Sequence, residues 1–350
     1  MSSVEPQAAW WEPIIDWGLV PDPVLRRVIT ARVASRVRHE TRGGVDARSE
    51  HLRDFIQARS KGPITHHIDD ANRQHYEVPT AFFEEVLGPR LKYSAAVWPD
   101  AVDDLSAAEE AALALTASRA RLADGQRILD LGCGWGSLSL WMAERFPAAE
   151  VVAVSNSVTQ RAHIEARAAE QELTNLTVVT ADIADFEAPG RFDRIVSVEM
   201  LEHVSNHGDL LARIARWLEP DGLLFVHVFC HREMGWEFDA ASSRDWMGRY
   251  FFSGGVMPSV DLLPRVATDL DLLDHWRISG RHYQRTLDAW LARLDERREQ
   301  VMPILVDTYG ATDAEAWFHR WRLFFMASAQ LWAYRRGNEF LVGHYLFQPR

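Results

Sequence analysis

The chain has 350 residues, of which 47% are hydrophobic and 25% are charged, proportions typical of a globular protein large enough for a well-buried core. Its formal net charge of −12 argues against a general nucleic-acid binder, because phosphate contacts need a basic surface. There are only two cysteines, Cys133 and Cys230, and neither a signal peptide nor a membrane-spanning apolar run, so we expect no disulfide framework, no metal site and a cytoplasmic location.

A helical region is expected over residues 1–121. Helices are predicted over residues 23–39, 48–60, 79–87 and 106–121, with proline and glycine between them. Ser106 and Glu109 have the spacing of a capping box at the start of the last helix. The first helix carries five arginines beside apolar residues, so it can either make peripheral contact with an anionic membrane or pack with its basic face in water.

The pattern changes at about residue 127, where short apolar runs begin to alternate with helical stretches. The runs cover residues 127–132, 150–155, 176–181, 192–198 and 222–229. Strands that are buried on both faces of a parallel sheet read as continuous apolar runs, whereas half-exposed strands alternate. We therefore predict an α/β fold with a doubly wound, mostly parallel, Rossmann-like sheet, in a domain that spans 122–350 and has its core at 127–230.

The remainder of this domain, residues 231–350, begins with a stretch at 236–255 that is rich in aromatic residues and glycine. Strand-like runs at 272–278 and 340–347 would complete the sheet, with helices near 287–300 and 314–334 between them. The aromatic stretch is then left as a lid or insertion. The chain has 14 tryptophans, several of them here, and they either pack in the core or form a wall around an apolar or cationic substrate.

The strongest motif is LDLGCGWGS at residues 129–137, between a predicted strand and a predicted helix. Gly132, Gly134 and Gly136 allow a tight turn and close approach of a ligand to the backbone, and the helix that follows offers free N–H groups. Dinucleotide folds and ordinary turns can show a similar glycine triplet. In methyltransferases such a turn packs against the amino-acid and ribose parts of S-adenosylmethionine, and we expect Asp130 and Gly132 to make that contact.

Polar residues also follow the next two predicted strands. The second strand ends in Ser155 and Asn156, with Gln160 close behind, rather than in the acid expected for a ribose diol. Asp182 follows the third strand, where its carboxylate can accept a hydrogen bond from the adenine amino group or cap a helix. These positions extend the expected cofactor site along the edge of the sheet.

Several motifs, in order along the chain, are similar to those of one family. They are HYEVPT at 75–80, GPRLKYS at 88–94, LGCGWGSLSL at 131–140, SNSVTQ at 155–160, EMLEH at 199–203 and WMGRYFFSGGVMPS at 246–259. With them the chain resembles the cyclopropane-fatty-acyl-phospholipid synthase superfamily, and most of all its coclaurine N-methyltransferase branch. The resemblance implies a class I methyltransferase that uses S-adenosylmethionine, in which Tyr76, Tyr93 and Ser94 close over the methionine part of the cofactor. It also implies that Ser155 and Gln160 take the place of the ribose-binding acid.

Two chemistries remain open, with a cofactor-binding protein that lacks catalysis as a third alternative. One is N-methylation of a small aromatic or alicyclic amine, and the other is methyl or methylene transfer to an unsaturated fatty-acyl chain. An amine is mostly protonated at neutral pH, so its site must hold a cation and remove a proton. The lipid synthases resemble one another in holding a bicarbonate ion as base, and the positions that bind it correspond here to Ala95, Glu202, His227 and Tyr283.

Two positions distinguish these chemistries. A cysteine of the bicarbonate site is Ala95 here, and the glycine that lipid synthases carry three residues before the Glu-His pair is Glu199. An extra buried carboxylate is costly beside acyl chains but suits a cationic amine. We therefore predict N-methylation of a small cationic amine, with a lipid acyl chain as the alternative substrate. The predicted catalytic residues are Glu199, Glu202, His203, His227 and Tyr283.

Overall fold

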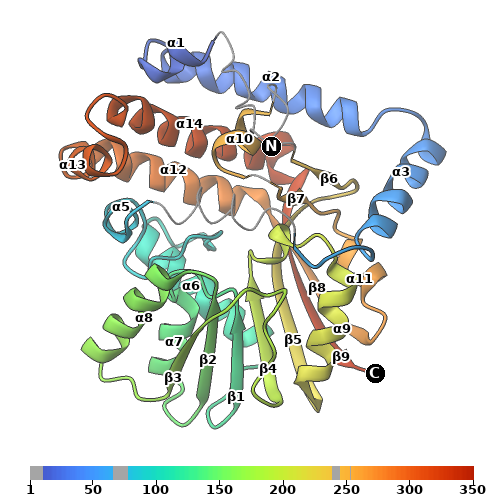
Figure 1. The fold of residues 1–350 in the computed structure, drawn as a ribbon. Helices are drawn as coiled ribbons and strands as arrows, with labels where there is room; N and C mark the ends of the chain where they lie inside the picture. The colour runs from blue at the N-terminus through green and yellow to red at the C-terminus, as the bar shows by residue number, and fades with distance from the viewer. Residues whose placement is uncertain (1–10, 66–77, 239–244, 253) are drawn as a thin grey trace, which may run out of the picture.

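The computed structural model of the chain describes residues 11–65, 78–238, 245–252 and 254–350. Its central feature is a seven-stranded sheet with the strand order β3-β2-β1-β4-β5-β9-β8 (Figure 1). β1 to β5 run parallel, while β9 is antiparallel to both β5 and β8. The predicted doubly wound, mostly parallel sheet is confirmed. Its strands are β1 (Arg127–Leu131), β2 (Glu150–Ser155), β3 (Leu176–Thr180), β4 (Phe192–Val198), β5 (Leu218–His231), β8 (Leu270–Ser279) and β9 (Phe340–Pro349).

The strand order determines where a ligand can bind. β2 and β3 lie on one side of β1, and β4 and β5 lie on its other side, so the winding of the chain reverses between β1 and β4. At such a point the connections leave the sheet in opposite directions and open a crevice at the carboxyl ends of the strands. The residues of β1 and β2 are buried almost throughout, which is why both strands read as continuous apolar runs.

Helices cover both faces of the sheet. Ile128 of β1 packs with α6 and α7 on one face, where α8 packs against Ala153 of β2, whereas Leu129 packs with α3, α9 and α11 on the other. Consecutive side chains of a strand point to opposite faces of the sheet, so one apolar run packs against the helices on both faces. These helices are α3 (Val45–Ala58), α6 (Leu105–Arg119), α7 (Ser137–Arg145), α8 (Val158–Glu170), α9 (His207–Trp217) and α11 (Leu262–Val266).

The start of α6 differs from the sequence prediction. The side chain of Asp104 caps this helix by accepting a hydrogen bond of 2.9 Å from a backbone N–H of the first turn. The predicted capping box of Ser106 and Glu109 is therefore wrong. Glu109 is buried instead, and its carboxylate accepts hydrogen bonds from the N–H groups of Gly88 at 3.1 Å and Arg90 at 3.0 Å.

A further layer of helices lies beyond one end of the parallel strands (Figure 1). Two helices replace the single one that the sequence predicts near 287–300, because α12 already begins at Gly280 and the helical path is interrupted at Arg297. The layer contains α1 (Glu12–Asp16), α2 (Asp22–Glu40), α5 (Thr80–Val86), α12 (Gly280–Glu296), α13 (Arg298–Tyr309) and α14 (Ala314–Ala333).

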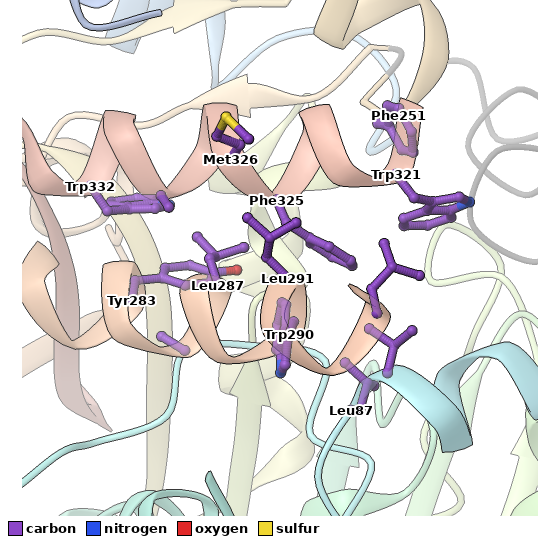
Figure 2. Packing of buried hydrophobic residues seen from close by; sticks show 14 of the residues in the cluster. Leu87, Phe251, Tyr283, Leu287, Trp290, Leu291, Trp321, Phe325, Met326 and Trp332 are labelled. Atoms are coloured by element: carbon purple, nitrogen blue, oxygen red, sulfur yellow. The ribbon is translucent and has the colours of Figure 1, made fainter. Parts of the chain in front are cut away.

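The interface between α12 and α14 is the apolar centre of this layer. Figure 2 shows Tyr283 and Leu291 of α12 facing the side of α14 that carries Phe325 and Trp332. Trp290 and Trp321 are each 1% exposed, so these tryptophans serve core packing, one of the two roles considered from the sequence. Their large buried surfaces stabilise the helical layer, and the same cluster includes Phe340 and Val342 of β9, so the layer also packs on the sheet.

The aromatic stretch at 236–255 is divided between core and cavity. It contains β6 (Trp236–Glu237) and α10 (Trp246–Tyr250) and is followed by β7 (Val256–Met257), while 239–244 and 253 lie outside the described residues. Phe251 is 1% exposed and stacks on Phe324 of α14 with ring centroids 4.4 Å apart. The segment is thus anchored in the helical layer, and its closure as a lid over bound ligands stays a prediction.

The basic helix predicted at 23–39 is α2. Val33 and Val37 are buried in the same apolar cluster as α14, and Arg26 pairs with Asp288 of α12 at 2.9 Å. Part of the basic face is therefore used within the molecule, and contact with a membrane surface stays a prediction. Across the described ranges, no helix is long and apolar enough to cross a membrane.

Candidate active site

A cavity of about 1260 Å³ lies between the carboxyl ends of the parallel strands and the helical layer. Most residues that the sequence assigns to the site line it. Gly136, Glu202 and His227 are not part of its lining, and Tyr76 lies outside the described residues. The predicted residues that line the cavity are Tyr93, Ser94, Asp130, Gly132, Gly134, Ser155, Asn156, Gln160, Asp182, Glu199, His203 and Tyr283.

The glycine-rich turn after β1 forms one wall. Gly132 has a φ of +83°, and a Cβ at this position would lie 2.5 Å from the Cγ of Met200, so no larger residue fits. At Gly134 no described atom lies within 4 Å of the place a Cβ would take, so this backbone borders open cavity. A Cβ at Gly136 would lie 2.6 Å from Cγ1 of Ile164, which makes this glycine necessary for the packing of α7 on α8. The turn therefore leaves room for a ligand at Gly134.

Asp130, at the end of β1, brings a buried carboxylate to the cavity. It is 2% exposed, and its Oδ2 accepts a hydrogen bond of 2.5 Å from the hydroxyl of Ser139. Burial raises the pKa of Asp130 to about 6 in spite of this hydrogen bond. A ligand ammonium group beside the carboxylate would favour its ionised form, so the residue fits the amino-acid part of S-adenosylmethionine.

The residues after β2 and β3 continue this wall. The Ser155 hydroxyl donates to Oε1 of Gln160 at 2.6 Å, and Ser157 caps α8 by accepting a hydrogen bond from the N–H of Gln160 at 3.2 Å. Asp182 both lines the cavity and accepts a hydrogen bond of 2.7 Å from the N–H of Ala184. Its local turn role and a contact with a ligand are thus compatible, because a carboxylate has further lone pairs.

Lys92 is a charged residue of the cavity wall to which the sequence analysis gave no role. Its Nζ donates hydrogen bonds to the Ser94 hydroxyl at 2.5 Å and to the carbonyl of Ala95 at 2.8 Å. Burial lowers the pKa of Lys92 to about 8, although Glu199 and Glu109 favour its charged form. Its place directly before Tyr93 and Ser94, which the sequence analysis assigns to the cofactor, is the signal that could have indicated it.

Glu199 lies at the centre of the site, directly after β4. Its Oε1 accepts a hydrogen bond from the N–H of Ala95 at 2.9 Å and contacts Nε2 of His227 at 3.0 Å, while its Oε2 accepts one from the Tyr283 hydroxyl at 2.6 Å. Burial alone would raise the pKa of Glu199, but the contact with His227, the charge of Lys92 and the N–H of Ala95 outweigh it and lower this pKa. The cavity therefore contains a carboxylate that stays ionised.

The backbone of Glu199 is also unusual. Its φ is +49°, in the left-handed region that glycine favours and that other residues rarely adopt. This is the position at which the sequence analysis contrasts the chain with the glycine of lipid synthases. A side chain is therefore present where the backbone conformation alone would favour none.

Glu202 and His203 follow in the short 3₁₀-helix η1 (Leu201–His203). Oε1 of Glu202 accepts a hydrogen bond of 2.7 Å from the N–H of Phe229, and burial together with the charge of Glu199 raises the pKa of Glu202 well above its ordinary value. Burial lowers the pKa of His203 to about 4, so its imidazole is neutral near pH 7. His203 lines the cavity, whereas Glu202 is completely buried behind it.

Aromatic rings of the cavity lining surround these charged groups. The ring of Phe229 lies 5.8 Å from that of Phe252 and 5.7 Å from that of Trp332, measured between centroids. Tyr283 stacks on Trp332 at 4.8 Å, and His203 lies 4.8 Å from Phe252. Aromatic faces attract organic cations, so the wall and Glu199 favour the same kind of ligand. Among the residues that the structure describes, no cluster of histidine, cysteine and acidic side chains could hold a metal ion.

The strand order, the glycine turn and the position of the cavity define a class I, Rossmann-like methyltransferase. Comparison with known proteins identifies the family. A sequence profile described as mycolic acid cyclopropane synthetase matches residues 65–338, and the chain belongs to this family.

Relatives of both kinds considered from the sequence occur among the similar proteins. The (S)-coclaurine N-methyltransferase of Thalictrum flavum subsp. glaucum is 33% identical over 340 residues, which cover 96% of this chain and 94% of that protein. The crystal structure of coclaurine N-methyltransferase bound to N-methylheliamine and S-adenosylhomocysteine has a TM-score of 0.92 at 30% identity, covering 96% of this chain and 98% of that one. The cyclopropane synthase MmaA2 from Mycobacterium tuberculosis has a TM-score of 0.69 at 26% identity, covering 81% and 99%. The protein is thus an S-adenosylmethionine-dependent methyltransferase.

Proposed function

We propose that the protein transfers the methyl group of S-adenosylmethionine to the nitrogen of a small ring-containing amine that binds as a cation. The observation that carries the proposal is the carboxylate of Glu199, which accepts hydrogen bonds from the N–H of Ala95 and the Tyr283 hydroxyl in a cavity with aromatic walls. Such a carboxylate pairs with an ammonium group, and aromatic faces add cation–π attraction. The N-methyltransferases among the similar proteins, which are named for the amines coclaurine and pavine, support this substrate class.

The contacts of Glu199 also argue against lipid chemistry. The resemblance assigns the bicarbonate of lipid synthases to positions that correspond to Ala95, Glu202, His227 and Tyr283. The Glu199 carboxylate contacts three of these four positions, and a carboxylate has the size and shape of the planar part of bicarbonate. A bicarbonate ion would therefore have to displace the protein's own anion, and the pathway that needs this ion is disfavoured.

The backbone strain at Glu199 supports a functional role for its side chain. A left-handed conformation costs a residue with a Cβ roughly 1–2 kcal/mol relative to glycine. Strain of this kind persists where the surrounding structure and the function require a particular side chain. The carboxylate is placed in the cavity at this cost, which a lipid pocket with a glycine at the same position avoids.

The cofactor residues follow from the geometry of the turn. S-adenosylmethionine, when bound, supplies a methyl group on a positively charged sulfur. We assign its amino-acid part to Asp130 and the backbone at Gly134, and its ribose and adenine to Ser155, Asn156, Gln160 and Asp182. Tyr93 and Ser94, with Tyr76 as a prediction from the resemblance, are assigned to the methionine part.

Different residues bind the positive charge of the substrate and accept its proton. Glu199 holds the ammonium group of the substrate, and the neutral imidazole of His203 accepts its proton before methyl transfer. Glu202 stays protonated, because burial and Glu199 raise its pKa, and it supports the site from behind through the N–H of Phe229. The aromatic wall excludes water, so the free amine reacts in a desolvated cavity.

Methyl transfer to two kinds of acceptor tests the proposal. The protein is incubated with methyl-labelled S-adenosylmethionine and either (S)-coclaurine, within a panel of cyclic amines, or vesicles of unsaturated phospholipid with and without bicarbonate. We expect label in the amine fraction that does not depend on bicarbonate and whose rate of incorporation falls roughly 30-fold or more in Glu199→Gln. Label in the lipid that rises with bicarbonate and is indifferent to Glu199→Gln would establish the alternative chemistry.

Three further features belong to this proposal. Residues 1–121 would act mainly as a helical region that completes the substrate side, and 122–350 would form the methyltransferase domain. The two cysteines, both buried and unpaired, support a reducing compartment such as the cytoplasm. Peripheral membrane contact through α2 would matter if the amine is delivered from a lipid phase.

A further inference from the structure

A row of side chains crosses the sheet behind Glu199. His227 on β5 is the cross-strand partner of His344 on β9, and His344 is in turn the partner of Trp276 on β8. The guanidinium of Arg119, at the end of α6, lies 4.8 Å above the Trp276 ring. His227 and His344 are 3% and 1% exposed, whereas Arg119 is half-buried at the edge of the structure.

These groups form a continuous chain of polar contacts. Nη1 of Arg119 lies 2.8 Å from Nδ1 of His344, and Nε2 of His344 lies 2.9 Å from Nδ1 of His227. Nε2 of His227 then lies 3.0 Å from Oε1 of Glu199. Each distance is that of a hydrogen bond, so the chain connects the edge of the structure with the carboxylate in the cavity.

The chemistry of arginine determines the direction of every bond in this chain. A guanidinium group only donates, so Nδ1 of His344 must accept, and a neutral His344 then carries its proton on Nε2. That proton points to Nδ1 of His227, which must accept in turn and therefore carries its own proton on Nε2. The last N–H points to the carboxylate of Glu199. Both ring nitrogens of His227 are thus in use, and this histidine has no lone pair left to act as a base.

We propose that Arg119 and His344 are positioning residues that fix the proton of His227 on Nε2 and thereby hold Glu199 as an anion. The inference deepens the proposed function, because it concerns the carboxylate that would pair with the substrate. Three donors, His227, Tyr283 and the N–H of Ala95, then face the two oxygens of Glu199, and each favours the ionised form. Without a fixed donor at Arg119, the same row can reverse and present a lone pair of His227 to Glu199, which favours a protonated carboxyl.

The charged surroundings are consistent with neutral histidines in this row. Burial, followed by the neighbouring charges of His227, Arg119 and Lys92, lowers the pKa of His344 well below its ordinary value. Burial also lowers the pKa of His227, with Glu199 opposing this effect and Lys92 and Arg119 adding to it. Glu199 itself faces Lys92, Glu202, His203 and Tyr283, and Arg119 faces Asp274. The experiments below stay under pH 8, because Lys92 begins to lose its charge there.

The first test observes the protons and needs no substrate. Two-bond proton–nitrogen correlation spectra of protein labelled with ¹⁵N-histidine distinguish the two neutral tautomers, and His227→Gln and His344→Gln variants assign the two signals among the 14 histidines. We expect the Nε2–H tautomer for both residues from pH 6 to pH 7.5. Arg119→Lys, which keeps a cationic donor, should preserve these signals, whereas Arg119→Leu should shift both toward the Nδ1–H form. Native Nδ1–H signals, or an Arg119→Leu spectrum like the native one, would overturn the inference.

The second test measures the consequence for the carboxylate. In Arg119→Leu the acid limb of the pH profile of kcat/KM for (S)-coclaurine should move to higher pH, with about a tenfold loss at pH 6 and little loss at about pH 7.5. Arg119→Lys should restore the native profile. A uniform loss at every pH, with native tautomers, would mean that Arg119 only stabilises the fold. If no amine of the panel is methylated, the proposed function fails while the spectra still decide the inference.

Discussion

The strained backbone at Glu199 makes a prediction that separates conformation from charge. Glu199→Gly and Glu199→Ala both remove the carboxylate and differ by one methyl group. The effect of losing the carboxylate is therefore common to both, and the difference between their free energies of unfolding reports the effect of the Cβ. A Cβ in the left-handed region costs roughly 1–2 kcal/mol, and glycine avoids this cost at φ +49°. Glu199→Gly should therefore have a free energy of unfolding about 1–2 kcal/mol higher than Glu199→Ala, the opposite of the usual order in a helix or strand.

The same position then tests the charge. Glu199→Gln keeps the size of the side chain but removes its charge, and the loss of a paired charge at a binding site costs about 2–5 kcal/mol. This corresponds to a fall in kcat/KM for the amine of roughly 30-fold or more. S-adenosylmethionine should bind all three variants with native affinity, because the contacts of Glu199 are with Ala95, His227 and Tyr283 rather than with the glycine turn.

Urea unfolding measures the first difference, and steady-state kinetics with calorimetry of cofactor binding measures the second. Equal stability of the alanine and glycine variants would refute the left-handed conformation as a source of strain. Native turnover by Glu199→Gln would refute the pairing of this carboxylate with the substrate. A weaker affinity for the cofactor in all three variants would refute the assignment of Glu199 to the substrate side of the cavity.

Three further predictions follow from the charged groups of the cavity. Burial holds the pKa of Asp130 at about 6, and the ammonium group of the cofactor binds the ionised form, so affinity for S-adenosylmethionine measured by calorimetry should rise from about pH 5 to pH 7. Asp130→Asn should remove this rise and weaken binding by about 2–5 kcal/mol. A native affinity that does not change with pH would contradict the prediction. The pKa of Lys92 is about 8 in the folded protein and 10.5 in the unfolded chain, so the unfolded chain binds more protons between these pH values. The free energy of unfolding should therefore rise with pH across this window by up to about 3 kcal/mol. Lys92→Met should show a flatter dependence in urea unfolding, and equal slopes would count against the buried lysine. His203→Ala should lower kcat by roughly 10²–10⁴-fold, because it removes the base. Glu202→Gln should retain most turnover, because glutamine resembles the protonated acid. A large loss of turnover in Glu202→Gln would mean that Glu202 acts as an anion.

The sequence by itself determined the sheet and the cofactor turn. The parallel strands are recognisable because central ones such as β1 and β2 are buried on both faces, so that their apolar runs can be read without knowing their neighbours. The turn after β1 is recognisable from a local property, since Gly132 and Gly136 both have positive φ angles that favour glycine, although their close contacts with Met200 and Ile164 come from other parts of the chain. The start of α6 was missed for a similar local reason, because Asp104 competes with Ser106 for the cap and the two cannot be ranked without the backbone.

Only the tertiary structure decided what the polar residues of the site do. Ala95, Glu199, His227 and Tyr283 come from four separate parts of the chain, and no spacing indicates that three of them meet at one carboxylate. The burial of Lys92 and the contact of Arg119 with His344 likewise depend on how the helices pack on the sheet. Charge states follow from burial and from the direction of hydrogen bonds, and both are properties of surroundings that form only when distant segments come together.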